Sequence, residues 1–141
     1  MKRLTLLILF FLTACSDPGS PEQQVRDTIA RAEQAAEARD LGAIRELVHA
    51  EYEDRSGRDR RMLINQVRLY LMARQSLELL VKINDIKFTA NDFAEVDVTA
   101  AGLGLRAGMA GTGLAADKDH YQIDLARDED GNWLLIGARR F

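Results

Sequence analysis

The hydrophobic pattern of this 141-residue chain changes once, near Ser76, from a helical period to an alternating one. Before Ser76, apolar residues recur every three or four positions, which places them on one face of an α-helix. After it, apolar and polar residues alternate, as in a β-strand with one buried face. Helices followed by a run of strands are typical of α+β proteins. The sequence therefore predicts an α+β fold with an antiparallel sheet after the helices.

Three helices are predicted before this change. The first begins at Pro21, with Ser20 as N-cap and Gln23 completing a capping box. Asp40 caps a second, shorter helix, and a third extends from about Arg58 to Arg74. The three apolar stripes contain Val25, Ile29, Ala32 and Ala36; Leu41, Ile44, Leu47 and Val48; and Leu63, Val67 and Leu71.

Four strands are predicted after it. In the first, Leu77, Leu79, Val81 and Ile83 share one face, whereas Ile86 and Phe88 have the opposite parity. That switch predicts a bulge or bend at Asn84-Asp85. The later strands alternate around Ala94 to Ala100, around Tyr121 to Leu125, and from Trp133 to Arg140, which follows a hairpin turn.

The segment from Gly102 to Leu114 is rich in Gly and Ala and has no strong period. Its glycines do not match the dinucleotide-binding spacing, and no helix pattern follows them, which disfavours a phosphate cradle. We therefore expect a long, mobile hairpin connection, whose Leu and Met side chains could contact a partner or lipid.

The start of the chain carries a targeting pattern. Lys2 and Arg3 precede an apolar run over residues 6–12, as in a secretory signal. The run is shorter than the roughly 20 residues that span a bilayer. The segment from Leu12 to Cys15, Leu-Thr-Ala-Cys, resembles the lipobox of bacterial lipoproteins. The resemblance implies cleavage after residue 14 and lipid on Cys15; the alternative is an ordinary signal peptide with an unrelated cysteine.

These features divide the chain into three parts. Residues 1–14 are expected to be a cleaved signal peptide, residues 15–20 the lipidated cysteine and a short tether, and residues 21–141 one folded domain. In the lipoprotein family, Ser16 directly after Cys15 implies transfer to the outer membrane. The expected location is therefore its periplasmic face, with membrane lipid bound through acylated Cys15.

Charge and cysteine content argue against several classes of site. The formal net charge is −3, so the chain lacks the basic balance typical of nucleic-acid binding. Cys15 is the only cysteine, and once it is acylated no thiol remains for a disulfide, a zinc site or a nucleophile. The two histidines have no metal-ligand spacing. No metal and no cofactor are predicted.

The element order and three short segments resemble the nuclear transport factor 2-like superfamily. These segments are Ala38 to Leu41, the crossing from Tyr52 to Gly57, and Asp130 to Trp133. The resemblance covers nearly all of residues 21–141. It implies a cone-shaped fold in which three N-terminal helices pack on a curved antiparallel sheet around a pocket. Members use that pocket for catalysis, for binding or for assembly.

Within that superfamily, the SnoaL and ketosteroid-isomerase branch places its catalytic Asp in a Glu-Asp-Pro-x-Gly pattern. The segment from Glu53 to Gly57 is similar, which implies Asp54 as a general base. A base needs a desolvated carboxylate and donors that hold the oxyanion. Arg55 replaces the Pro, the first helix has no Tyr donor, and a nearby Arg favours the ionised carboxylate. The alternative role for Asp54 is a turn or capping carboxylate.

Other candidate residues carry two interpretations each. Tyr52, Tyr70, His120 and Trp133 could line a binding pocket, although aromatic residues on amphipathic elements are usually core, and we expect Trp133 to be buried. Near the start of the third helix lie four arginines that could form either a solvated salt-bridge network or an anion site: Arg55, Arg58, Arg60 and Arg61.

The sequence therefore favours a lipid-anchored envelope protein whose domain is a non-enzymatic binding or accessory module. A small apolar ligand or an envelope protein is the expected partner, and a homodimer is compatible with the sequence. The alternative is an isomerase- or dehydratase-type enzyme with Asp54 as base and Tyr52 and His120 nearby. A deep apolar cavity enclosing Asp54 and a second polar group would favour the enzyme.

Overall fold

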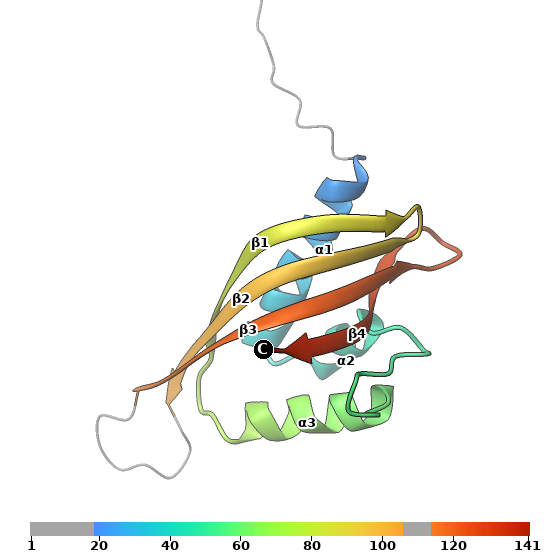
Figure 1. The fold of residues 1–141 in the computed structure, drawn as a ribbon. Helices are drawn as coiled ribbons and strands as arrows, with labels where there is room; N and C mark the ends of the chain where they lie inside the picture. Colours follow the sequence, from blue (N-terminus) through green and yellow to red (C-terminus); the bar gives the residue numbers. More distant parts are fainter. Residues whose placement is uncertain (1–18, 106–113) are drawn as a thin grey trace, which may run out of the picture.

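The computed structural model describes residues 19–105 and 114–141. Three helices come first: α1 (Pro21–Glu37), α2 (Leu41–Glu46) and α3 (Arg60–Met72). Four strands follow: β1 (Glu78–Ala90), β2 (Phe93–Leu105), β3 (Leu114–Arg127) and β4 (Trp133–Arg140). The strands pair antiparallel in the order β1-β2-β3-β4 and form a curved sheet that arches over the helices (Figure 1). The predicted α+β class is confirmed.

A short polar side chain caps the start of each helix. Ser20 and Asp40 each accept a hydrogen bond from a backbone amide three residues ahead, at 3.1 and 3.0 Å, as predicted. The third helix begins two residues after the predicted start, because Asp59 is its N-cap and accepts from the Met62 amide at 2.8 Å. These side chains therefore set where the helices begin.

Arg39 connects the α1–α2 turn to the end of α3. Its backbone adopts φ 59°, the left-handed conformation that often ends a helix. Its guanidinium donates to the carbonyls of Leu71 and Arg74, both at 2.7 Å. Because these carbonyls lie at the C-terminal end of α3, the cation also interacts favourably with the helix dipole. One residue thus turns the chain and caps a distant helix.

The main core lies between α1 and the inner face of the sheet. Val25 of α1 and Val96 of β2 are fully buried, and Trp133 is 1% exposed. This cluster is completed by Ile29, Ala94, Val98 and Leu125. A second cluster of Val48, Tyr52 and Ile64 fills the space between the α2 end and α3. Leu135 of β4 packs against both clusters and so joins them.

The predicted bulge in β1 is confirmed. Ile83 pairs with Val98 and Asp85 with Asp97, so Asn84 is the extra residue. Because of this insertion, Ile83 and Ile86 both pack against the core in spite of their opposite parity. The Asn84 side chain forms hydrogen bonds with two β2 side chains, Asp97 and Thr99, each at 3.0 Å.

The segment between α2 and α3 joins the outer edge of β4. The His49 amide donates to the Leu135 carbonyl at 2.8 Å, and the Leu135 amide donates to the Leu47 carbonyl at 2.9 Å. The Glu53 amide then donates to the carbonyl of Ile136, a residue that bulges out of the β3–β4 ladder, at 3.2 Å. The crossing segment is therefore fixed to the sheet by backbone bonds.

The prediction that residues 102–114 form a connection between two strands was wrong at both ends of that segment. β2 extends to Leu105 and β3 begins at Leu114, and these two residues pair. Backbone pairing does not need apolar alternation, so a Gly- and Ala-rich stretch can continue a ladder that its side chains do not signal. The remainder of the predicted connection, residues 106–113, lies outside the described residues.

Candidate functional site

An apolar cavity of about 390 Å³ lies between the helices and the concave face of the sheet. Its walls come from all three helical segments and all four strands, and include Ile29, Ala32, Ala36, Ile44, Leu63, Val67, Val81, Val98, Ile123 and Leu135. Of the described residues that line it, Glu33 alone is charged. Its size and lining are those of a site for a small apolar molecule.

A second hollow of about 550 Å³ adjoins this cavity. The two share six lining residues: Ala36, Leu63, Val67, Leu79, Ala100 and Tyr121. The second hollow adds the polar side chains of Tyr52, Arg58, Gln66, Tyr70, Asp119 and Arg140. An apolar chamber therefore continues into a region that offers hydrogen-bonding groups.

Two tyrosines, the buried Tyr52 and the half-buried Tyr121, carry hydroxyls in this polar region. The Tyr121 hydroxyl donates to the Asp119 carboxylate at 3.2 Å, and Arg140 lies 3.6 Å from the same oxygen. Burial, and then the charge of Asp119, raises the pKa of Tyr121. Burial, and then Asp54, raises the pKa of Tyr52 to about 12. Both phenols therefore stay neutral near pH 7 and act as hydrogen-bond donors.

Asp54 lines neither hollow, and its carboxylate is occupied within its own turn. The side chain is 2% exposed and accepts from the amides of Ser56 and Arg58 at 2.8 and 3.0 Å. It also accepts from the Arg58 guanidinium at 2.6 Å. Burial alone would raise the pKa of Asp54, but the hydrogen bonds from Arg58 and Ser56 outweigh burial and lower it. This environment favours the ionised carboxylate and weakens it as a base.

Tyr70 lies in the wall of the polar hollow, where a glycine makes room for it. A Cβ atom on Gly102 would lie 2.7 Å from the Tyr70 hydroxyl oxygen, which is closer than such contacts occur. One face of the ring is covered by Arg74, whose guanidinium lies 3.5 Å from the ring centroid. Tyr70 can therefore occupy this position because residue 102 has no side chain.

The structure does not bring His120 and Trp133 to this site. His120 lines no described cavity; it forms a short hydrogen bond with Asp97, and its ring lies 5.1 Å from that of Phe141. Trp133 is buried, as predicted. Its ring packs 5.8 Å from the Phe88 ring, and its Nε1 donates to the Gln24 side chain at 3.2 Å. Trp133 is thus part of the core.

The sequence analysis missed Asp119, Arg140 and Gln66 as cavity residues. Asp119 has the same strand parity as Tyr121, which is a weak signal for a carboxylate on the inner face. Arg140 pairs directly with Tyr121 across β3 and β4. That pairing depends on the bulge in β4, which no residue pattern announced.

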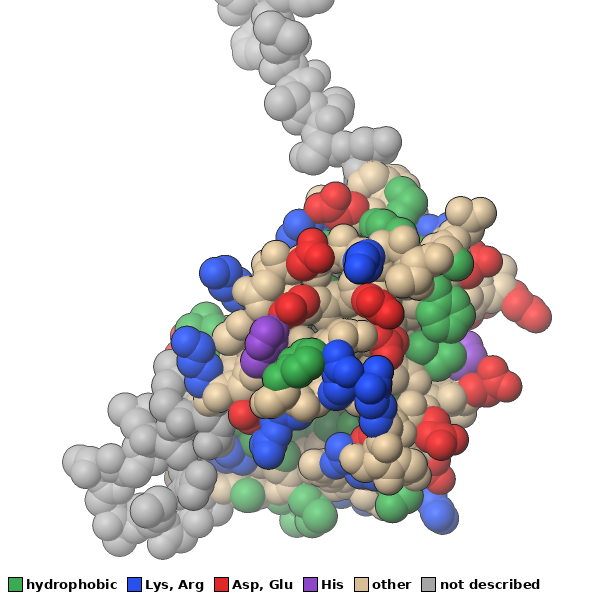
Figure 2. Space-filling view, in the orientation of Figure 1, with side chains coloured by type: hydrophobic (Ala, Val, Ile, Leu, Met, Phe, Trp, Pro, Cys, Tyr) green, Lys and Arg blue, Asp and Glu red, His purple; other side chains and the backbone are tan. Residues whose placement is uncertain are grey.

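The described residues hold no group of three or more potential metal ligands, and their helices are all too short or too polar to cross a membrane. Acidic and basic side chains are mixed over the face drawn in Figure 2. The predicted signal peptide and Cys15 lie outside the described residues, so their roles remain predictions from the sequence.

No protein-family model matches the sequence, and no curated protein is significantly similar to it. Solved structures do resemble the fold. A candidate scytalone dehydratase from Novosphingobium aromaticivorans has a TM-score of 0.72 at 11% identity, over 85% of this chain and 83% of that one. A nuclear transport factor 2-like superfamily protein from Salmonella enterica serovar Typhimurium has a TM-score of 0.68 at 12% identity, over 85% and 89%.

A third structure is a candidate dehydratase of the nuclear transport factor 2-like family from Streptomyces avermitilis. Its TM-score is 0.68 at 15% identity, over 84% of this chain and 94% of that one. Identities this low carry information about the fold alone. The resemblance that the sequence suggested is confirmed at that level: the chain has the nuclear transport factor 2-like fold.

Proposed function

We propose that this protein is a lipid-anchored envelope protein whose domain binds a small apolar molecule without transforming it. The observation that carries the proposal is the apolar cavity of about 390 Å³ and its continuation into a polar hollow. A ligand with an apolar body and one polar group matches this division. The apolar part would lie among the aliphatic side chains, and the polar group would meet the hydroxyl of Tyr52 or Tyr70.

A binding role is favoured over catalysis by the contacts of the acidic side chains. Asp54 lies outside both hollows, and its carboxylate accepts three hydrogen bonds from its own turn. The carboxylate at the polar hollow, Asp119, is engaged by Tyr121 and Arg140. Two structural neighbours are named dehydratases. Dehydration requires proton transfer, and the Asp54 carboxylate, which the family pattern would assign as the base, is held by its own turn outside both hollows.

The proposed anchor is the acylated Cys15, on the strength of the lipobox-like sequence that ends there. Helix α1 begins at Pro21, so only a few residues separate Cys15 from the cone-shaped domain. Such an anchor would hold the domain next to the membrane, and the proposed location is the periplasmic face of the outer membrane. A site for apolar molecules beside a lipid surface would draw its ligand from that membrane.

Binding can be tested on the full chain with N-phenyl-1-naphthylamine, an uncharged apolar fluorophore whose emission rises in a dry site. Ala36 lines both hollows, so Ala36→Phe would fill the point where they meet. Ala30→Phe makes the same change on an exposed position of the same helix and is the matched control. We expect saturable binding by the wild type and Ala30→Phe, and a loss of about tenfold or more in Ala36→Phe.

Equal binding by all three proteins, or no binding by the wild type, would refute the cavity as the binding site. Catalysis is tested separately, with a panel of cyclic ketones and hydroxylated aromatic substrates. Wild-type turnover that Asp54→Asn abolishes would establish the enzymatic alternative instead.

A further inference from the structure

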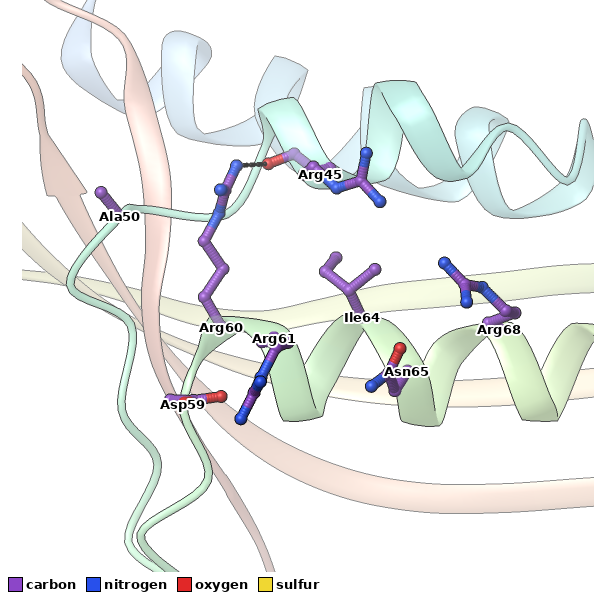
Figure 3. Close-up of a pocket in the computed structure, with 8 residues that line it drawn as sticks. All are labelled: Arg45, Ala50, Asp59, Arg60, Arg61, Ile64, Asn65 and Arg68. Atoms are coloured by element: carbon purple, nitrogen blue, oxygen red, sulfur yellow. Dashed lines mark hydrogen bonds between the residues drawn. The ribbon is translucent and has the colours of Figure 1, made fainter.

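A groove of about 580 Å³ lies between α2 and α3, apart from the apolar cavity. Its walls carry four arginines: Arg45 from α2, and Arg60, Arg61 and Arg68 from α3. Figure 3 shows Arg45 on one side of the groove facing Arg68 and Ile64, which lie side by side on α3. Ile64 is 4% exposed, so the floor of the groove is firmly packed.

Arg60 is held in place and changes the charge of one wall. Its guanidinium donates to the Arg45 carbonyl at 2.7 Å (Figure 3) and to the Val48 carbonyl at 3.1 Å. These carbonyls belong to the C-terminal end of α2, which would otherwise repel an anion. The side chain therefore covers a negative helix end with a positive group.

The other three guanidiniums of the groove have no partner among the residues that the structure describes. Among the described residues, Arg45, Arg61 and Arg68 form no side-chain hydrogen bond and no ion pair, and all three are exposed. Other arginines differ: Arg26 pairs with Glu22 at 2.8 Å, and Arg58 pairs with Asp54 at 2.6 Å. Unpaired like charges gathered in one groove destabilise the free protein slightly, and an anion would relieve that repulsion.

The carboxylate in the groove does not neutralise these arginines. Asp59 is the N-cap of α3, and its Oδ1 accepts from the Met62 amide at 2.8 Å. It forms no ion pair with Arg60 or Arg61 among the described residues. Asn65, one turn after Arg61 on the same face of α3, adds a neutral hydrogen-bonding amide.

We propose that this groove binds a phosphate-bearing anion. Guanidiniums match phosphate oxygens with paired N–H donors, and arginines from two helices can reach different oxygens of one phosphate. Arg60 would contribute charge without moving, and Arg45 and Arg68 would close on the anion from opposite walls. The phosphate could belong to a free phosphate compound or to a lipid headgroup. The site is independent of the apolar cavity and of the proposed apolar ligand.

The test uses the full chain and two probes, inorganic phosphate and vesicles. Phosphate is titrated at constant ionic strength in a non-phosphate buffer, and the arginine Nε–H signals are followed by NMR. Vesicles of phosphatidylcholine with and without phosphatidylglycerol are sedimented with the protein, and the difference isolates the contribution of the anionic headgroup. The test variant is Arg45→Gln/Arg68→Gln. Lys82→Gln/Lys87→Gln removes the same charge from exposed positions on β1 and is the control.

We expect the groove variant to lose about tenfold or more in affinity for at least one probe, while the control keeps wild-type affinity. If the groove variant loses affinity for inorganic phosphate, the ligand is a free phosphate compound. If it loses affinity for the anionic vesicles alone, the ligand is a lipid headgroup. Both variants should retain the wild-type circular dichroism spectrum, because the mutated side chains form no hydrogen bond or ion pair within the described part of the chain. The proposal would be overturned if the wild type bound neither probe, or if the two double variants bound with equal affinity.

Discussion

Asp54→Asn distinguishes a structural carboxylate from a catalytic one by its effect on stability. The substitution keeps the shape of the side chain and removes its charge. Asn retains an oxygen that can accept from the amides of Ser56 and Arg58, as Oδ1 does at 2.8 and 3.0 Å. Its amide nitrogen would replace Oδ2, which accepts from the Arg58 Nε at 2.6 Å. Two donors would then face each other.

The magnitude follows from that single lost bond. A hydrogen bond to a charged group contributes about 1.5–3 kcal/mol. Asp54 is 2% exposed, but Arg58 is 40% exposed and can turn its charge toward water. Leaving the Arg58 cation without its partner therefore costs little. We expect the free energy of unfolding to fall by about 2 kcal/mol at pH 7.

The pH dependence provides a second readout. The hydrogen bonds from Arg58 and Ser56 outweigh burial and hold the folded-state pKa of Asp54 below its unfolded value of about 3.9. Its stabilising contribution is therefore complete above that unfolded value and is lost as the pH falls through the lower folded-state pKa. The difference between wild type and Asp54→Asn should shrink over the same acidic range.

Urea denaturation at several pH values measures both quantities. Asp59→Asn is the matched control, because Asp59 is an exposed N-cap and Asn caps helices as well as Asp does. The control should stay within about 0.5 kcal/mol of the wild type. If Asp54→Asn matched the control at pH 7, or if its deficit did not change with pH, the structural role assigned to this carboxylate would be wrong.

Three further predictions concern other parts of the chain. Trp133→Ala should lower the free energy of unfolding in urea by about 3–5 kcal/mol, because the ring is 1% exposed; a near-unchanged value would contradict its place in the core. Gly102→Ala should cost about 1 kcal/mol by displacing the Tyr70 hydroxyl, and should change naphthylamine affinity; unchanged stability and affinity would contradict the close approach. Cys15→Ser should move the protein from the membrane fraction to the soluble one; retention through alkaline washing after normal processing would refute lipidation.

Local signals in the sequence predicted much of the fold. Ser20 and Asp40 act on amides three residues away, so their roles can be identified without knowing the tertiary structure. The parity switch after Ile83 similarly predicted the bulge at Asn84, because burial requires both Ile83 and Ile86 to face inward.

The candidate site was harder to predict because it depends on register between distant segments. Arg140 meets Tyr121 through the β3–β4 pairing, and an inserted residue in β4 shifts that pairing. The arginine groove depends on the relative placement of α2 and α3. Of the arginine cluster noted at the start of the third helix, Arg60 and Arg61 line the groove. Arg58 binds Asp54, whereas Arg45 and Arg68 join from elsewhere.

The bulge at Asn84 also affects how this sheet meets other chains. β1 is a 13-residue strand at one edge of the sheet, and such an edge can template pairing with a strand from another molecule. An inserted residue breaks the regular spacing of its amides and carbonyls, and exposed Lys82 and Lys87 flank the interruption. Regular strand addition along β1 would require desolvating these lysines and matching an irregular ladder. The irregularity that turns Ile86 into the core therefore also protects the protein against aggregation through its exposed edge.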